Sequence, residues 1–101
     1  MDDKTTRILN DLITSIATLN TVKSIGISGK LRPSPLPGMG DFDIFVYCDE
    51  IPGERTRHNK LTSCTGIEDI RNLGSSDTWD CTDYCTIMNI DTFVIFLKHW
   101  M

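Results

Sequence analysis

The sequence predicts an α/β domain of the α+β type, in which a small mixed β-sheet is flanked by helices. Three observations support this fold class: an amphipathic pattern near the N-terminus, a carboxylate-bearing apolar run over 41–46, and two further apolar runs near the C-terminus. Helix and strand patterns thus follow one another along 101 residues, a length that suits one domain over 1–101.

The first half of the chain predicts one helix and two strands. Residues 4–21 carry apolar side chains at helical spacing, so we expect a helix that packs one face on the core. Residues 22–28 predict a short strand that ends at Gly29. Residues 30–40 contain three prolines at every second position, which excludes a helix interior or a central strand and predicts a surface loop. Residues 42–48 form the strongest strand pattern, with one face apolar throughout.

The next segment predicts a second helix over 54–64. Its basic residues, Arg55, Arg57 and Lys60, are expected on the outer, solvated face. Residues 65–80 contain turn signals but no clear period, so no element is predicted there.

The C-terminal part predicts two strands, 82–88 and 92–98, joined by a tight turn over 89–91. The second of them is apolar on both faces and is therefore expected at the centre of the sheet. The chain stops directly after it, so it is either a minimal domain or the N-terminal part of a longer protein.

Composition and charge restrict the classes of function. The formal net charge of −4 argues against a dedicated nucleic-acid-binding module, which would show a basic stripe. A secretion signal and an 18-residue apolar stretch are both lacking, so we expect a cytoplasmic protein without a membrane segment. Among the four cysteines only Cys81 and Cys85 are close in sequence, and no second pair lies at zinc-ligand spacing. We therefore interpret them as free thiols.

Asp41 and Asp43 are the most informative residues. In a strand, residues two apart face the same side, about 7 Å apart, so both carboxylates can reach one cation. Two like charges at that range repel by about 2 kcal/mol at an effective dielectric near 20. A hard divalent cation such as Mg²⁺ would remove this repulsion, and we expect these two residues to bind it. The alternative is structural, with Asp41 capping a turn and Asp43 meeting a lysine.

Four features follow one another along the chain: a helix, a strand ending in Ser28-Gly29-Lys30, a ten-residue loop and a strand bearing Asp41-Phe42-Asp43. This order resembles the core of the polymerase-β-like nucleotidyltransferase superfamily. This resemblance implies transfer of a nucleoside monophosphate from a nucleoside triphosphate to a hydroxyl acceptor, with a two-metal Mg²⁺ site. It implies Asp41 and Asp43 as catalytic metal ligands, and Ser28, Gly29 and Lys30 as nucleotide-binding residues.

The resemblance also implies a third catalytic carboxylate on a later strand. Asp91 is the candidate, but it would fall in the turn if the turn spans 89–91. Asp80 and Asp83 both come before the last predicted strand, 92–98, and are poorer candidates. Lys30 stands where the family has Ser or Gly, which motivates an alternative function as a catalytically degenerate module.

Two alternatives for partners stay open. The acceptor is expected to be a small molecule or a protein, and a polynucleotide is disfavoured by the acidic charge. Small stand-alone members of the superfamily act as antitoxins, so the chain could instead bind a helical toxin-type partner, or a helical domain could follow residue 101.

Overall fold

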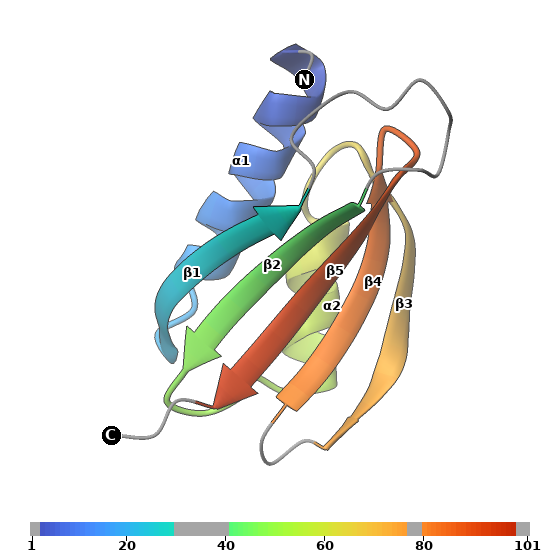
Figure 1. Cartoon of the computed structure of the whole chain (residues 1–101). Helices are drawn as coiled ribbons and strands as arrows, with labels where there is room; N and C mark the ends of the chain where they lie inside the picture. Colours follow the sequence, from blue (N-terminus) through green and yellow to red (C-terminus); the bar gives the residue numbers. More distant parts are fainter. Residues whose placement is uncertain (1–2, 30–40, 77–79, 99–101) are drawn as a thin grey trace.

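The computed structural model describes residues 3–29, 41–76 and 80–98, and Figure 1 shows their arrangement. Two helices and five strands follow one another along the chain: α1 (Asp3–Ala17), β1 (Val22–Gly29), β2 (Asp41–Cys48), α2 (Glu54–Thr62), β3 (Ile67–Ser76), β4 (Asp80–Ile87) and β5 (Ile90–Lys98). The predicted α+β fold with a mixed sheet is confirmed. The predicted proline-rich loop over 30–40 lies outside the described residues.

The five strands form one sheet in the order β1-β2-β5-β4-β3. β2 and β5 are parallel, and the other neighbouring pairs are antiparallel. The prediction that the last strand is central is confirmed, because β5 is third of the five. Both helices lie behind the sheet in Figure 1, so they cover one face and leave the other open.

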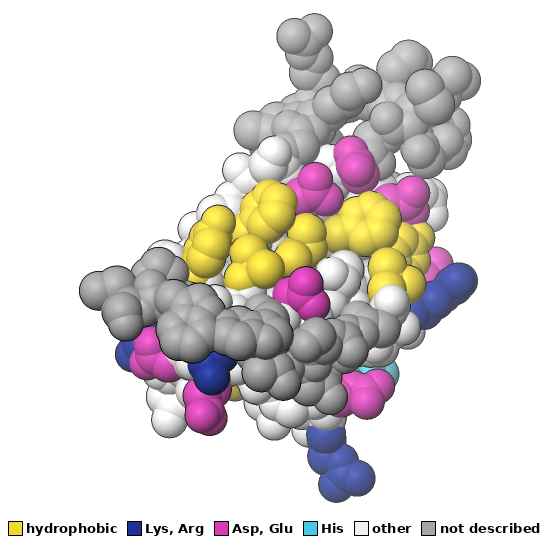
Figure 2. All heavy atoms as spheres, turned by 60° about the horizontal axis from the view of Figure 1, so that its bottom comes forward, with side chains coloured by type: hydrophobic (Ala, Val, Ile, Leu, Met, Phe, Trp, Pro, Cys, Tyr) yellow, Lys and Arg dark blue, Asp and Glu magenta, His cyan; other side chains and the backbone are white. Residues whose placement is uncertain are grey.

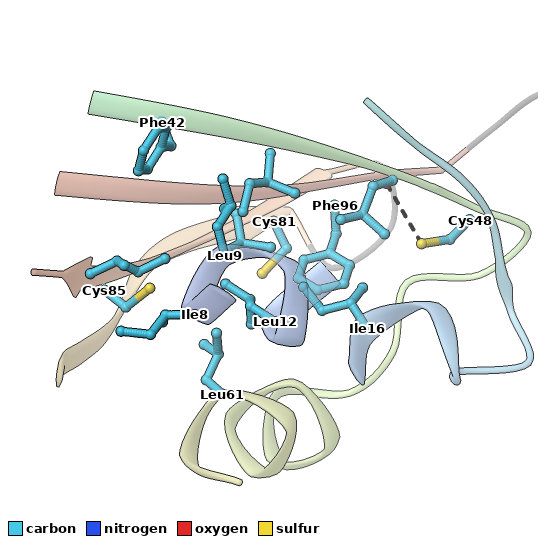
Figure 3. Close-up of a cluster of buried hydrophobic side chains, with 14 residues drawn as sticks. Ile8, Leu9, Leu12, Ile16, Phe42, Cys48, Leu61, Cys81, Cys85 and Phe96 are labelled. Carbon is cyan, nitrogen blue, oxygen red and sulfur yellow. Dashed lines mark hydrogen bonds between the residues drawn. The ribbon is translucent and has the colours of Figure 1, made fainter. Parts of the chain in front are cut away.

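The core lies between the helices and the covered face of the sheet (Figure 3). Leu12 and Ile16 of α1 are almost completely buried in this core. Ile44 and Val46 of β2 are completely buried there. The apolar positions of α1 recur at helical spacing and those of β2 at every second residue, so each element presents one apolar side to the other. α1 ends at Ala17, four residues before the predicted end at residue 21. α2 ends at Thr62, two residues before the predicted end at residue 64.

Helix α2 is attached to the sheet by a buried ion pair. The side chains of Arg57 and Asp83 are only 2% and 6% exposed, and Arg57 Nε donates to Asp83 Oδ2 at 3.0 Å. Asn72 Nδ2 donates to the other carboxylate oxygen, also at 3.0 Å. The guanidinium further donates to the carbonyl of Pro52 and lies 5.8 Å from the ring centre of Phe96.

This ion pair corrects one prediction. The expectation that Arg57 is solvated was wrong, because it lies one helical turn before Leu61 on the buried side of α2. Asp83 lies inside β4, on the face of the buried Cys81 and Cys85. Burial raises the pKa of the Asp83 carboxyl, and the neighbouring Arg57 opposes that rise.

The turn between β4 and β5 also differs from the prediction. It consists of Met88 and Asn89, which have positive φ values of 51° and 64°. Two residues with positive φ match the twist of a two-residue hairpin. Ile90 and Asp91 therefore belong to β5, and the predicted turn over 89–91 was wrong.

Candidate functional site

The open face carries the residues that alternate with the core positions. Apolar and aromatic side chains gather in its middle, with acidic groups beside them, as Figure 2 shows from an oblique direction. We call the apolar group the apolar band; its members lie on β2 and β5 and are all partly exposed: Phe45, Tyr47, Phe93, Ile95 and Leu97. The open face is thus neither a second core nor an ordinary polar surface.

Three carboxylates lie at one end of the open face. Because β2 and β5 are parallel, both begin at the same end of the sheet, and the register pairs Asp41 with Asp91. Asp43 follows Asp41 by two residues and therefore faces the same side. Neighbouring strands lie about 4.8 Å apart, so the backbone brings these three residues close together. We call this group the carboxylate end.

The end of β1 lies beside the carboxylate end. β1 and β2 are antiparallel, with Ser28 opposite Asp43 and Gly29 opposite Phe42. Ser28 is exposed and lies on the face of the carboxylates, because residues directly opposite in an antiparallel pair share a face. The structure therefore brings Ser28 and Gly29 next to the Asp pair. Lys30, the third predicted nucleotide-binding residue, lies outside the described residues.

Asp91 is the second residue of β5, so the alternative that placed it in a turn was wrong. Its side chain is partly exposed and accepts a hydrogen bond from the hydroxyl of Tyr84, with 2.6 Å between Tyr84 Oη and Asp91 Oδ1. The hydrogen bond to Asp91 raises the pKa of the Tyr84 phenol, because loss of the proton would place two negative charges together.

The ring of Tyr84 is itself held in place on the open face. It meets the ring of Phe93 edge to face, with 5.5 Å between centroids and 60° between planes. The guanidinium carbon of Arg71 lies 5.7 Å from the same ring centre. Both contacts are of the kind that favours one ring position.

The side chains of the carboxylate end do not form a closed cluster. Within residues 3–29, 41–76 and 80–98, no group of three or more His, Cys, Asp or Glu side chains is arranged to hold a metal ion. The Asp91 side chain is hydrogen-bonded to Tyr84 of β4, which lies on the opposite side of β5 from β2. The backbone thus brings the carboxylates to one place, while their side chains remain apart.

The sequence prediction missed Tyr84 and Arg71. A signal for Tyr84 was present, because it alternates with Cys81, Asp83 and Cys85 and so had to face away from the core. Its contact with Asp91 depends on the pairing of β4 with β5, which follows only once the hairpin turn is correctly placed.

All four cysteines are free thiols, as predicted. In the part of the chain that the structure describes, neither helix is long and apolar enough to cross a membrane.

Comparisons of the chain with protein-family models, with curated proteins and with solved structures found no match. The carboxylate end, with the neighbouring end of β1, is therefore the basis on which a function can be proposed.

Proposed function

We propose that the chain is a metal-dependent nucleotidyltransferase domain of the polymerase-β-like superfamily. It would transfer a nucleoside monophosphate from a nucleoside triphosphate to a hydroxyl acceptor. The observation that carries this proposal is the register of β2 and β5, which pairs Asp41 with Asp91 and leaves Asp43 beside them on one face. Separate parts of the sequence supply the two strands, yet the register places the residues that carry these carboxylates at the same end of the sheet.

The donor chemistry of the carboxylate end fits Mg²⁺. All three side chains offer carboxylate oxygens, the ligands that hard divalent cations prefer. Asp41 and Asp43 would hold the ions and Asp91 would complete the set. The mutual repulsion of three negative charges is a cost that a bound cation removes. When bound, Mg²⁺ would activate the acceptor hydroxyl and stabilise the charge that develops on the leaving pyrophosphate.

The end of β1 would receive the triphosphate. Gly29 has no side chain to obstruct the phosphates, and its position beside Phe42 brings its backbone close to the Asp pair. Ser28 can donate its hydroxyl hydrogen to a phosphate oxygen from the exposed position opposite Asp43. Lys30, which follows Gly29 in the sequence, would contribute a positive charge.

The acceptor is proposed to be a small molecule or a protein side chain. The net charge of −4 and the acidic carboxylate end disfavour a polynucleotide, whose phosphates would be repelled. Free thiols at all four cysteines support a reducing compartment, and we place the protein in the cytoplasm.

Calorimetric titration of ATP and GTP, with and without Mg²⁺, tests the proposal. The wild type should show saturable binding that requires the metal, and Asp43→Asn should weaken it by more than about tenfold, because even a lost outer-shell partner costs about 10- to 100-fold in metal affinity. Asp80→Asn is the matched control, because Asp80 faces the same side at the opposite end of the sheet. Equal binding by wild type and Asp43→Asn would refute the proposal.

Partner binding by the open face is a second candidate function, favoured by the apolar band. In this alternative the chain is a catalytically degenerate, antitoxin-like module. The band lies between the carboxylate end and Asp80, which suits a helical partner with an apolar stripe and basic residues at its borders. Phe93→Ser should then abolish capture of a helical partner while Asp43→Asn leaves it intact, and the opposite pattern would exclude this alternative.

A further inference from the structure

The outer edge of β1 is free of a neighbouring strand in the part of the chain that the structure describes. β1 is the first strand in the sheet order, and β2 is its one strand neighbour there (Figure 1). The free edge of a strand presents a row of backbone N–H and C=O groups that can pair with another chain. We propose that two copies of this chain pair through antiparallel β1 strands, so that their sheets join into one. The pairing does not depend on the proposed function, because it leaves the open face of each copy uncovered.

β1 lacks the features that protect an edge strand, whereas β3, the strand at the other edge of the sheet, has them. The pairing of β3 with β4 is interrupted by register shifts, and Asp69 of β3 has a φ of 52°. Bulges and charged side chains of this kind hinder pairing between edges. β1 instead pairs with β2 in unbroken register from Ser24 to Gly29, and it contains no proline. β1 is therefore the edge to which a further strand can be added.

The charges at β1 permit a second copy as the partner. The chain has a formal net charge of −4, so two copies repel each other unless they meet where acidic side chains are lacking. β1 contains no acidic residue. Its one charged side chain, Lys23, is paired with Asp49, with 3.0 Å between Lys23 Nζ and Asp49 Oδ2. Two β1 strands can therefore approach each other without strong repulsion.

The outer flank of α1 is uncharged as well. Figure 1 shows α1 behind the β1 side of the sheet and α2 behind its middle. The α2 side of α1 is identified by Asp11, whose carbonyl oxygen lies 4.0 Å from the sulfur of Cys64, two residues after α2. At 3.6 residues per turn, four residues without charge share the flank that is turned away from α2. They are Thr6, Asn10, Ile13 and Ala17.

The sequence of β1 is complementary to itself when two antiparallel copies are paired around Gly26. Ile25 of one copy then lies opposite Ile27 of the other, twice in the symmetric pair. Ile27 lies on the helix-covered face, because it is opposite the buried Ile44, yet it is 45% exposed. Ile25 of the second copy would cover it, and β-branched side chains that are directly opposite stabilise a sheet. The pairing thus explains an exposed isoleucine on the apolar side of the sheet.

The other residue pairs of this register are also compatible. Ser24 lies opposite Ser28, both exposed in the single chain, and hydroxyl groups at such positions can form hydrogen bonds across the strands. Lys23 lies opposite Gly29, so two like charges are not opposed. The same patch serves on both copies, which is the arrangement of a closed twofold dimer.

Sedimentation equilibrium of wild type, Ile27→Lys and Leu73→Lys tests the pairing. The wild type should dimerise, and Ile27→Lys should raise the dissociation constant of the dimer by about tenfold or more, because both Ile25–Ile27 pairs are lost at once. Leu73→Lys is the matched control: Leu73 is 52% exposed on β3 at the other edge, and its replacement should leave the constant unchanged.

Three results would overturn the inference. One is a wild type that stays monomeric at the concentrations used for NMR, as expected if β1 pairs with an extended segment of a different protein. Another is a dimer that Ile27→Lys leaves intact. The third is equal weakening by Leu73→Lys, which would place the contact elsewhere.

A second measurement needs no substitution. In a mixture of isotope-labelled and unlabelled wild type, isotope-filtered nuclear Overhauser spectra detect contacts between copies only. They should connect the methyl groups of Ile25 with those of Ile27. A dimer without these contacts, or one whose contacts connect Phe93 and other members of the apolar band, would overturn the pairing through β1.

Discussion

Replacing Arg57 by methionine tests the buried ion pair between α2 and the sheet. Methionine keeps much of the packing volume but removes the guanidinium that donates to Asp83 Oδ2 at 3.0 Å. The Asp83 carboxylate, only 6% exposed, would keep Asn72 as its donor and lose its counter-charge. Breaking a buried pair by removing one partner costs about 3–5 kcal/mol. A domain of this size has about 5–15 kcal/mol of stability, so the variant should remain folded.

Protonation of Asp83 limits the loss of stability in Arg57→Met and makes that loss depend on pH. An ordinary aspartate has a pKa of about 3.9, and each pKa unit is worth about 1.36 kcal/mol, so neutralising Asp83 at pH 7 costs about 4 kcal/mol. The same step at pH 5 costs about 1.5 kcal/mol. The loss of stability in Arg57→Met should therefore be about 3–4 kcal/mol at pH 7 and less than half of that at pH 5.

The sign follows from the direction of the pKa shift. Burial already raises the pKa of Asp83, and removal of Arg57, which lowers it, should raise it further. A folded state that binds the proton more tightly is favoured at low pH, so stability is lost as the pH rises from the unfolded pKa through the folded one. The difference in the free energy of unfolding between wild type and Arg57→Met should therefore grow as the pH rises from the unfolded to the folded pKa of Asp83.

Urea unfolding at pH 5 and pH 7, followed by far-ultraviolet circular dichroism, measures this difference. Arg55→Met is the matched control, because Arg55 is exposed on the same helix and should change stability by less than about 0.5 kcal/mol. A loss below about 1 kcal/mol in Arg57→Met at pH 7, or a loss that does not depend on pH, would contradict a stabilising role of the buried ion pair. Adding Asp83→Leu to Arg57→Met should restore most of the lost stability, because apolar groups can replace a buried pair without penalty.

Two further predictions concern residues with positive φ. Gly66→Ala should destabilise the fold by about 1–3 kcal/mol, because the φ of Gly66 is +92° and the new Cβ would lie 2.6 Å from Ile8 Cδ1. Gly26→Ala is the control, because a Cβ at Gly26 meets no atom within 4 Å. Equal urea unfolding midpoints for the two variants would contradict this expectation. Met88→Asn should raise the free energy of unfolding by about 0.5–1 kcal/mol, because Met88 is exposed with φ of 51° and asparagine tolerates that conformation better. A lower thermal midpoint for Met88→Asn would show that the turn is not strained at this residue.

Local patterns were sufficient for much of the fold. The alternation in β2 and the apolar run of β5 correctly predicted both strands, and the helical spacing near the N-terminus predicted α1. β3 was not predicted, because its register shifts interrupt the alternation that identifies a strand. The parallel pairing of β2 with β5 also could not be read from the sequence, since it joins segments more than 40 residues apart.

The candidate site was predicted only in part for the same reason. Asp41 and Asp43 share a strand, so their common face follows from spacing alone. The place of Asp91 depends on where the hairpin turns, and a turn of three residues was expected where two suffice. Arg57 was assigned to solvent from its charge, although Leu61 four residues later indicated the buried side of the helix. A charge on a buried face is explained only by its partner, here Asp83 on a strand distant in sequence.

The location of a bound divalent cation distinguishes a metal site at the carboxylate end from other acidic positions of the chain. Mn²⁺ added in small steps to the ¹⁵N-labelled chain broadens the amide signals nearest to the ion first. Broadening should begin at residues 28–29, 41–43 and 90–92, and Asp43→Asn should suppress it. First broadening around Asp80 or around residues 49–50, with the carboxylate end unaffected, would contradict the assignment of Asp41, Asp43 and Asp91 as a metal site.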